Sequence, residues 1–197
     1  MKIDTKVTSR LKDIGGIVIF VAAVFIGAWL INTFVFRSFN VDGPSMEDTL
    51  HTGDRLIVNR LPVTWSHIRG ADYIPERGQI IVFKNPQWQT GQVNEYIVKR
   101  VIAFPGERVV VKDGKVTVYN NSHQDGIDVD KEHPGALQPT DGSVDTTVAE
   151  GTIFVLGDHR QGGYSCDSRA CLGTIPFEDI IGPVSLRLFP FDQIRFF

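Results

Sequence analysis

The sequence contains little cysteine, no excess of basic residues and only one long hydrophobic run in its 197 residues. Two cysteines are too few for a disulfide-rich scaffold or a four-cysteine zinc site. Domains that bind nucleic acids are usually basic, whereas this chain carries 20 basic and 23 acidic side chains. We therefore expect no nucleic-acid partner. A chain of this length buries roughly 68–75% of its unfolded surface, so a core needs no metal.

The hydrophobic run covers residues 14–36 and contains no charged side chain. As an α-helix it would be about 34 Å long, which exceeds the ~30 Å hydrocarbon core of a bilayer. A cleaved signal peptide is the alternative, but its apolar part has only ~7–15 residues and ends at small residues. This run is longer and ends in Phe34, Val35 and Phe36. We therefore predict a retained transmembrane helix in a lipid bilayer.

Basic residues flank this run mainly on its N-terminal side, at Lys2, Lys6, Arg10 and Lys12. Positive charge favours the cytoplasmic side of a membrane. We therefore expect residues 1–13 to form a cytoplasmic tail and residues 37–197 to form an extracytoplasmic domain. No second run reaches 18 apolar residues, so the prediction is a single-pass protein of the cell membrane.

Residues 37–197 consist of short apolar runs between turn-forming residues, which is typical of a mainly β domain. Asp113-Gly114 joins two β-branched runs and strongly indicates a two-residue hairpin turn. No helical periodicity of useful length follows the membrane run. Residues 120–150 hold seven acidic residues against one lysine. We expect residues 113–150 to form an acidic insertion or a small second lobe.

Ser45 lies in a segment that can expose a hydroxyl group. Gly43-Pro44 before it forces an irregular turn, and such a turn can aim backbone N–H groups at one point, as an oxyanion hole requires. A serine in an ordinary surface turn is the alternative.

Lys99 lies in the predicted strand 96–103, where alternation places it on one face with Ile97, Val101 and Ala103. Burial among apolar side chains lowers the pKa of a lysine, and a neutral amine can act as a general base. The alternatives are that Lys99 reaches solvent or pairs with an acid.

A third polar segment follows the apolar run 153–156. Residues 157–160 and 165–169 combine hydroxyl, carboxylate and guanidinium groups that can hold a lysine amine by hydrogen bonds: Asp158, Arg160, Ser165, Asp167 and Arg169. A solvated loop with surface ion pairs is the alternative.

Together these segments resemble the bacterial type I signal peptidases, which are membrane-anchored serine proteases with a Ser–Lys dyad. The matching segments occur in the family's order behind the membrane run: residues 43–50, 53–58, 96–107, 157–160 and 165–169. The resemblance implies a fold of two antiparallel β-sheet lobes with the site near the membrane surface. It also implies removal of signal peptides from precursor proteins at Ala-x-Ala sites, without a metal or cofactor.

By this resemblance Ser45 is the nucleophile, Lys99 is the general base and Ser165 orients the lysine amine. The remaining matched residues are supports of the site: Asp158, Arg160, Asp167 and Arg169. The candidates for lining shallow substrate pockets are Phe39, Val41, Leu50 and Val98.

The sequence departs from the family pattern at three places. Asp48 stands where the family often has proline. Gly43 stands where some members have a serine that assists the oxyanion hole, so the hole would rely on the Ser45 N–H and a neighbouring group. Four residues, 161–164, separate Arg160 from Ser165 where the family usually has two.

Several alternatives stay open from the sequence. A Ser-His-Asp hydrolase would use His51 or His159 as the base, and a non-catalytic anchored binding protein would use neither. Cys166 and Cys171 can form a disulfide in an exported domain or remain free thiols. The apolar residues 186–197 can pack in the core or enter the membrane interface.

Overall fold

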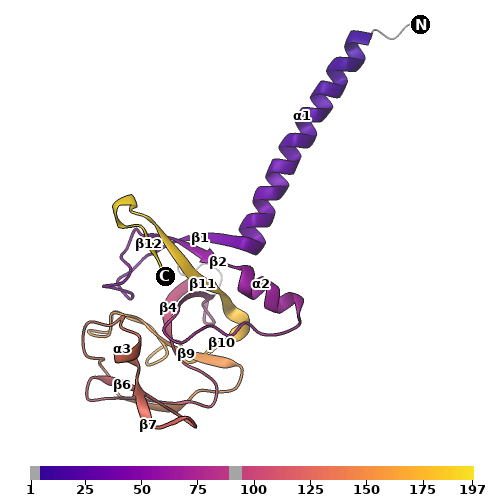
Figure 1. Ribbon diagram of the computed structural model, residues 1–197. Coiled ribbons are helices and arrows are strands. Elements are labelled where there is room, and N and C mark those ends of the chain that lie inside the picture. The colour runs from indigo at the N-terminus through magenta and orange to yellow at the C-terminus, as the bar shows by residue number, and fades with distance from the viewer. Residues whose placement is uncertain (1–4, 89–94) are drawn as a thin grey trace.

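The computed structural model describes residues 5–88 and 95–197 (Figure 1). Helix α1 (Thr5–Leu30) continues into a π-helical turn, η1 (Ile31–Val35). The segment Ile14–Val35 has a mean hydropathy of 2.7, and it is the one helix among the described residues that is long and apolar enough to cross a membrane. α1 projects away from the body of the molecule. The expected tail, residues 1–13, falls partly outside the described residues.

The main sheet is antiparallel and carries the candidate site. Its strands follow the order β1-β2-β11-β3-β4-β9-β10, with β12 paired to β11. The bounds are β1 (Phe36–Asn40), β2 (Arg55–Asn59), β3 (Ile80–Lys84), β4 (Tyr96–Ala103), β9 (Thr152–Leu156), β10 (Ile175–Pro176), β11 (Ile180–Phe189) and β12 (Arg195–Phe196).

A second antiparallel sheet lies at the end of the body farthest from α1 (Figure 1). Its order is β7-β6-β5-β8, and a short helix, α3 (Val129–Glu132), follows β7. The bounds are β5 (Arg108–Lys112), β6 (Lys115–Asn120), β7 (His123–Asp128) and β8 (Val144–Thr147). Asp113 and Gly114 both have positive φ, as the predicted β5–β6 hairpin turn requires. The predicted fold class, mainly β with two antiparallel sheets behind one apolar helix, is confirmed.

Both faces of the main sheet are covered. On β3, Ile80 and Val82 belong to one buried cluster while Ile81 and Phe83 belong to another. This explains why the strand reads as a continuous apolar run instead of an alternating one. A third cluster fills the second lobe with valines from β5 and β6.

The sequence shows no helical period of useful length after the membrane run, yet the structure has a short helix, α2 (Leu61–Ile68), between β2 and β3. A helix of eight residues with one buried side chain, Val63, is too short to show a clear 3.6-residue period. Short 3₁₀ turns occur at η2 (Phe177–Asp179) and η3 (Phe191–Gln193). The aromatic residues of the C-terminal segment are exposed and do not pack in the core: Phe189, Phe191 and Phe196.

Candidate active site

Ser45 sits in a turn that two buried side chains anchor. Met46 and Leu50 have no exposed surface and pack against β2 and β3 in one core cluster. Gly43, with φ of +95°, takes a conformation that favours glycine, and its N–H donates to Thr52 Oγ1 at 3.0 Å. The turn therefore has a fixed shape, and Gly43 supports it.

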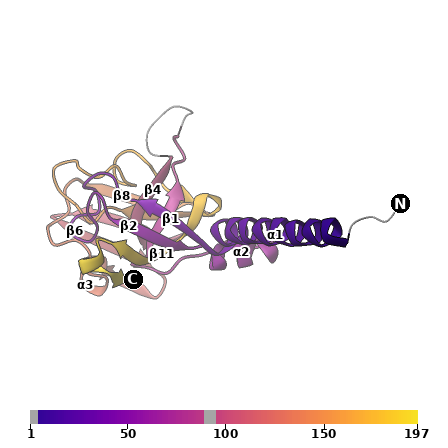
Figure 2. The same ribbon diagram turned by 90° about the horizontal axis from the view of Figure 1, so that it is seen from above.

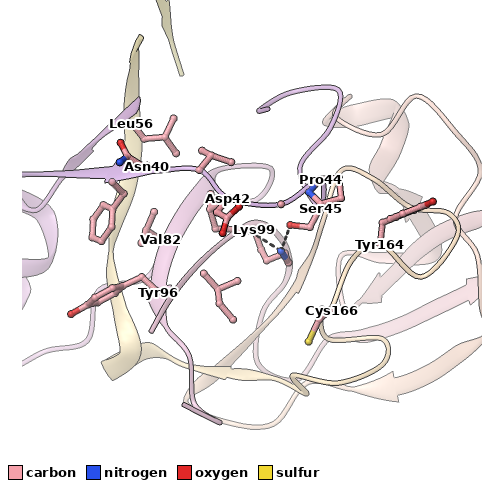
Figure 3. Close-up of a pocket in the computed structure, with 15 residues that line it drawn as sticks. Asn40, Asp42, Pro44, Ser45, Leu56, Val82, Tyr96, Lys99, Tyr164 and Cys166 are labelled. Atoms are coloured by element: carbon pink, nitrogen blue, oxygen red, sulfur yellow. Dashed lines mark hydrogen bonds between the residues drawn. The ribbon is translucent and has the colours of Figure 1, made fainter. Parts of the chain in front are cut away.

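Lys99 reaches the serine from β4. Its Nζ donates to Ser45 Oγ at 2.6 Å and to the Val98 carbonyl oxygen at 3.0 Å (Figure 3). The residue is only 3% exposed. Burial lowers the pKa of Lys99 to about 8, although the nearby charges of Asp167 and Asp158 act in the opposite direction. A substantial minority of the amine is therefore neutral at physiological pH, whereas almost none of an ordinary lysine would be.

The neighbouring Arg100 joins three segments on the other side of the strand. Its Nε and Nη2 donate to the two carboxylate oxygens of Asp158 at 2.8 and 2.6 Å. Thr49, from the turn that carries Ser45, donates its hydroxyl to the same carboxylate at 2.6 Å. A buried ion pair thus ties together β4, the loop after β9 and the turn that carries Ser45.

Asp167 organises the loop that follows. It accepts hydrogen bonds from Ser165 Oγ at 2.7 Å, Arg169 Nη2 at 2.9 Å and the Gly157 N–H at 3.1 Å. Burial raises the pKa of Asp167, but these donors outweigh burial and hold the pKa below its usual range. The Ser165 hydroxyl is therefore bonded to Asp167, while the Lys99 amine bonds Ser45 and Val98 among the described residues.

Ser165 nevertheless lies beside the turn that carries Ser45. A Cβ at Gly157 would collide with both Ser165 Oγ and the Ser45 carbonyl oxygen, so glycine permits this close approach. The His159 N–H donates to the same carbonyl at 3.2 Å.

Arg160 connects the site to the second lobe. The side chain is almost completely buried, and it donates to the Gly157 carbonyl oxygen at 2.5 Å and to Thr140 Oγ1 at 3.0 Å. It also forms an ion pair with Asp130 at 3.0 Å. Asp130 and Thr140 belong to the acidic segment, so this segment packs against the site loop.

A pocket of about 250 Å³ opens onto Ser45 and Lys99 (Figure 3). Three of the four predicted lining residues are there: Phe39, Val41 and Val98. Leu50 is not, because its side chain turns into the core beside Met46. Sequence reasoning missed the lining residues Leu56, Val82, Tyr96 and Tyr164.

Tyr164 is the missed residue for which the sequence held a signal. It belongs to the four-residue segment 161–164 that is longer than the family pattern, and the structure places it at the rim of the pocket. Its ring packs on His159, with centroids 4.8 Å apart. Cys166 also lines the pocket and forms a disulfide with Cys171.

Comparison with known proteins assigns a family. The family model described as signal peptidase, peptidase S26, matches residues 14–189. Signal peptidase I of Bacillus amyloliquefaciens is 33% identical, covering 85% of this chain and 84% of that protein. Signal peptidase IB of Staphylococcus aureus strain MRSA252 is 28% identical, covering 91% of each. A solved signal peptidase I from Enterococcus faecalis V583 is 24% identical, with a TM-score of 0.40 over 57% of this chain and 98% of the other. The chain therefore belongs to the signal peptidase family, peptidase S26, and is a serine endopeptidase.

Proposed function

We propose that this endopeptidase removes N-terminal signal peptides from exported precursor proteins, with Ser45 as nucleophile and neutral Lys99 as general base. The observation that supports the dyad is the 2.6 Å hydrogen bond between Lys99 Nζ and Ser45 Oγ, made by an amine that is 3% exposed. Among the described residues, Lys99 is the side chain bonded to that hydroxyl, whereas the His159 backbone contacts only the Ser45 carbonyl. This favours the Ser–Lys alternative over a Ser-His-Asp hydrolase.

The reaction proceeds in two steps. Ser45 Oγ attacks the scissile carbonyl carbon while Lys99 Nζ accepts the hydroxyl proton, and the proton then passes to the leaving amine as the C–N bond breaks. Water, activated by the same amine, hydrolyses the acyl-enzyme and frees Ser45. The backbone N–H of Ser45 is the oxyanion donor that we assign. The Gly43 N–H already donates to Thr52, so Gly43 acts through the shape of the turn.

The substrate lies extended in the pocket. The ladder between β4 and β9 begins at Arg100, so the Tyr96–Lys99 half of β4 keeps an edge that β9 does not pair. A peptide can add to such an edge by main-chain hydrogen bonds. Phe39, Val41 and Val98 then line shallow apolar subsites, which fit the small residues of an Ala-x-Ala site.

Anchoring in the membrane would bring this site close to precursor proteins that are held in the same membrane. We propose that α1 crosses the bilayer with residues 1–13 in the cytoplasm and residues 37–197 outside it as the catalytic domain. Residues 113–150, together with β5 (Arg108–Lys112), form a small acidic lobe of that domain. Ser45 is nine residues beyond Phe36, within about 30 Å of the span at full extension. A precursor held in the same membrane by its own signal peptide would meet the site at that height.

Cleavage of a precursor whose leader ends in Ala-x-Ala tests this proposal. Ser45→Ala and Lys99→Met should each lower kcat/KM by about 10³-fold or more. Lys84→Met is the matched control, because Lys84 is an exposed lysine on the neighbouring β3, and it should cleave like the wild type. Near-full cleavage by Lys99→Met would remove the lysine mechanism, and unchanged processing by Ser45→Ala would favour a binding role.

A further inference from the structure

Helix α2 is fastened to the end of the apolar helix. The Arg60 N–H donates to the Val35 carbonyl oxygen at 2.8 Å, and Thr64 Oγ1 donates to the Phe34 carbonyl oxygen at 2.9 Å. The Arg60 guanidinium donates to a third carbonyl of the same turn, that of Thr33. These bonds satisfy carbonyl groups that a helix end leaves without internal partners.

α2 is also attached to the catalytic body. Val63 is 3% exposed and belongs to the core cluster that contains Val101 and Val155. In Figure 1 α2 runs at a steep angle to α1 below its foot instead of continuing its direction, and Figure 2, seen from above, shows α2 beneath the same end of α1. With α1 crossing the bilayer as proposed, α2 would lie near the membrane surface and at a steep angle to the span.

The face of α2 opposite Val63 is apolar and uncovered. Leu61, Trp65 and Ile68 follow the i, i+4, i+7 spacing of one helical stripe, and they are 49%, 55% and 71% exposed. The Arg69 guanidinium lies 4.6 Å from the centre of the Trp65 ring. Residues 60–70 contain two arginines and no acid. An apolar stripe with an indole ring and basic flanks is typical of helices that lie in a membrane interface.

We propose that α2 docks on the outer leaflet of the bilayer, with Leu61, Trp65 and Ile68 inserted at the level of the lipid headgroups and the exposed Arg69 among anionic phosphates. This inference rests on the proposed membrane anchoring by α1. The hydrogen bonds to residues 33–35 place α2 where the span ends, and this position selects a lipid surface as its occupant over a second copy of the chain. Held by the span, the core and the lipid, α2 fixes the height and tilt of the catalytic domain above the membrane.

Fluorescence quenching in vesicles of phosphatidylglycerol and phosphatidylcholine tests the proposal with the full chain. The sequence has three tryptophans, so Trp29→Phe with Trp88→Phe leaves Trp65 as the reporter. The matched variant Trp65→Phe with Trp88→Phe leaves Trp29, which reports on the span. Lipids brominated near the headgroup should quench Trp65 more than lipids brominated near the chain end. Trp29 should be quenched in the same vesicles by bromines within the hydrocarbon.

The outcomes separate the two proposals. If Trp29 is quenched while Trp65 is not, the docking of α2 is wrong and the anchor stands. If neither is quenched, the anchor fails and the docking fails with it. A Trp65 emission that is shifted to the blue without quenching by lipid would also contradict the proposal, because it indicates a protein partner such as a second copy.

Removing the stripe sharpens the test. Leu61→Ser with Ile68→Ser should abolish the quenching of Trp65, leave that of Trp29 and slow processing of a vesicle-bound precursor several-fold. Hydrolysis of a soluble peptide should not change, because both side chains lie outside the pocket. Leu137→Ser is the matched control, because Leu137 is an exposed leucine of the segment 113–150 and does not belong to α2. Persistent quenching of Trp65 in the double variant would contradict the assigned stripe.

Discussion

The two faces of β4 each bury a basic side chain, Arg100 on one face and Lys99 on the other. Of these two, only Arg100 is paired with a carboxylate among the described residues. Arg100 points to a carboxylate and meets both of its oxygens, whereas Lys99 meets a hydroxyl and a backbone carbonyl. The Arg100 face therefore compensates its charge in place. The Lys99 face does not, so burial lowers the pKa of the amine to about 8. The Arg100 face thus holds segments together, and the Lys99 face carries the proton transfer that we propose.

The low pKa of Lys99 depends on the partners of the two nearby carboxylates. Asp158 and Asp167 are close enough to raise the pKa of Lys99, but each is held by an arginine of its own, Arg100 and Arg169. The arginines thus neutralise the carboxylates that would otherwise keep the lysine protonated. We infer that the charge balance of the site consists of two satisfied ion pairs beside one amine without a carboxylate partner among the described residues.

The largest effect on activity should come from placing an arginine on both faces of β4. Lys99→Arg keeps the positive charge but replaces the amine with a guanidinium that does not lose its proton in proteins. We expect kcat/KM to fall by about 10³-fold at every pH from 6 to 10. Recovery of activity at high pH in this variant would contradict the role of a neutral base.

Breaking the Arg100 face should cost stability. Arg100→Met leaves Asp158 as a buried carboxylate without its cation, and we expect a loss of about 3–5 kcal/mol in the free energy of unfolding. Arg108→Met is the matched control, because Arg108 makes a similar two-pronged contact with Asp145 at the surface. Urea denaturation should show little change in that control. Equal losses in the two variants would mean that burial does not distinguish the pairs.

Replacing Lys99 should change the free energy of unfolding in the opposite direction and stabilise the fold. The folded-state pKa of about 8 lies below the unfolded value, so folding is penalised while the amine is protonated in the unfolded chain. At pH 7 Lys99→Met should therefore be more stable than the wild type by on the order of 2 kcal/mol. The gain should shrink as the pH rises from 8 towards 10.5. A loss of stability at pH 7 would show that the amine is well solvated or paired.

The smallest effect, on the pH dependence of the rate, should come from neutralising the Asp167 carboxylate. Asp167 raises the pKa of Lys99, so Asp167→Asn should move the rising limb of the pH–rate profile to lower pH, by less than about one unit. A purely structural role would lower the rate without moving the limb. Asp145→Asn is the control at the surface and should leave the limb in place.

The sequence predicted the features that depend on local chemistry. Alternation in 96–103 indicated that Lys99 is buried, and Asp113-Gly114 indicated the hairpin, because both depend on neighbours in the chain. The pairing of Arg100 with Asp158 joins residues far apart in the sequence, and it requires the tertiary fold. The same reason explains why Ser165 bonds Asp167 instead of the amine, and why Leu50 lies in the core. The helix α2 was missed because eight residues give too short a period.

The most direct test of the account is an NMR titration of the Lys99 side chain, followed at its Cε in selectively labelled protein, with Lys99→Arg identifying the signal. The account predicts a midpoint near pH 8, which coincides with the rising limb of kcat/KM. A midpoint at the ordinary lysine value of about 10.4 would contradict it, because the amine would then be protonated whenever the enzyme works.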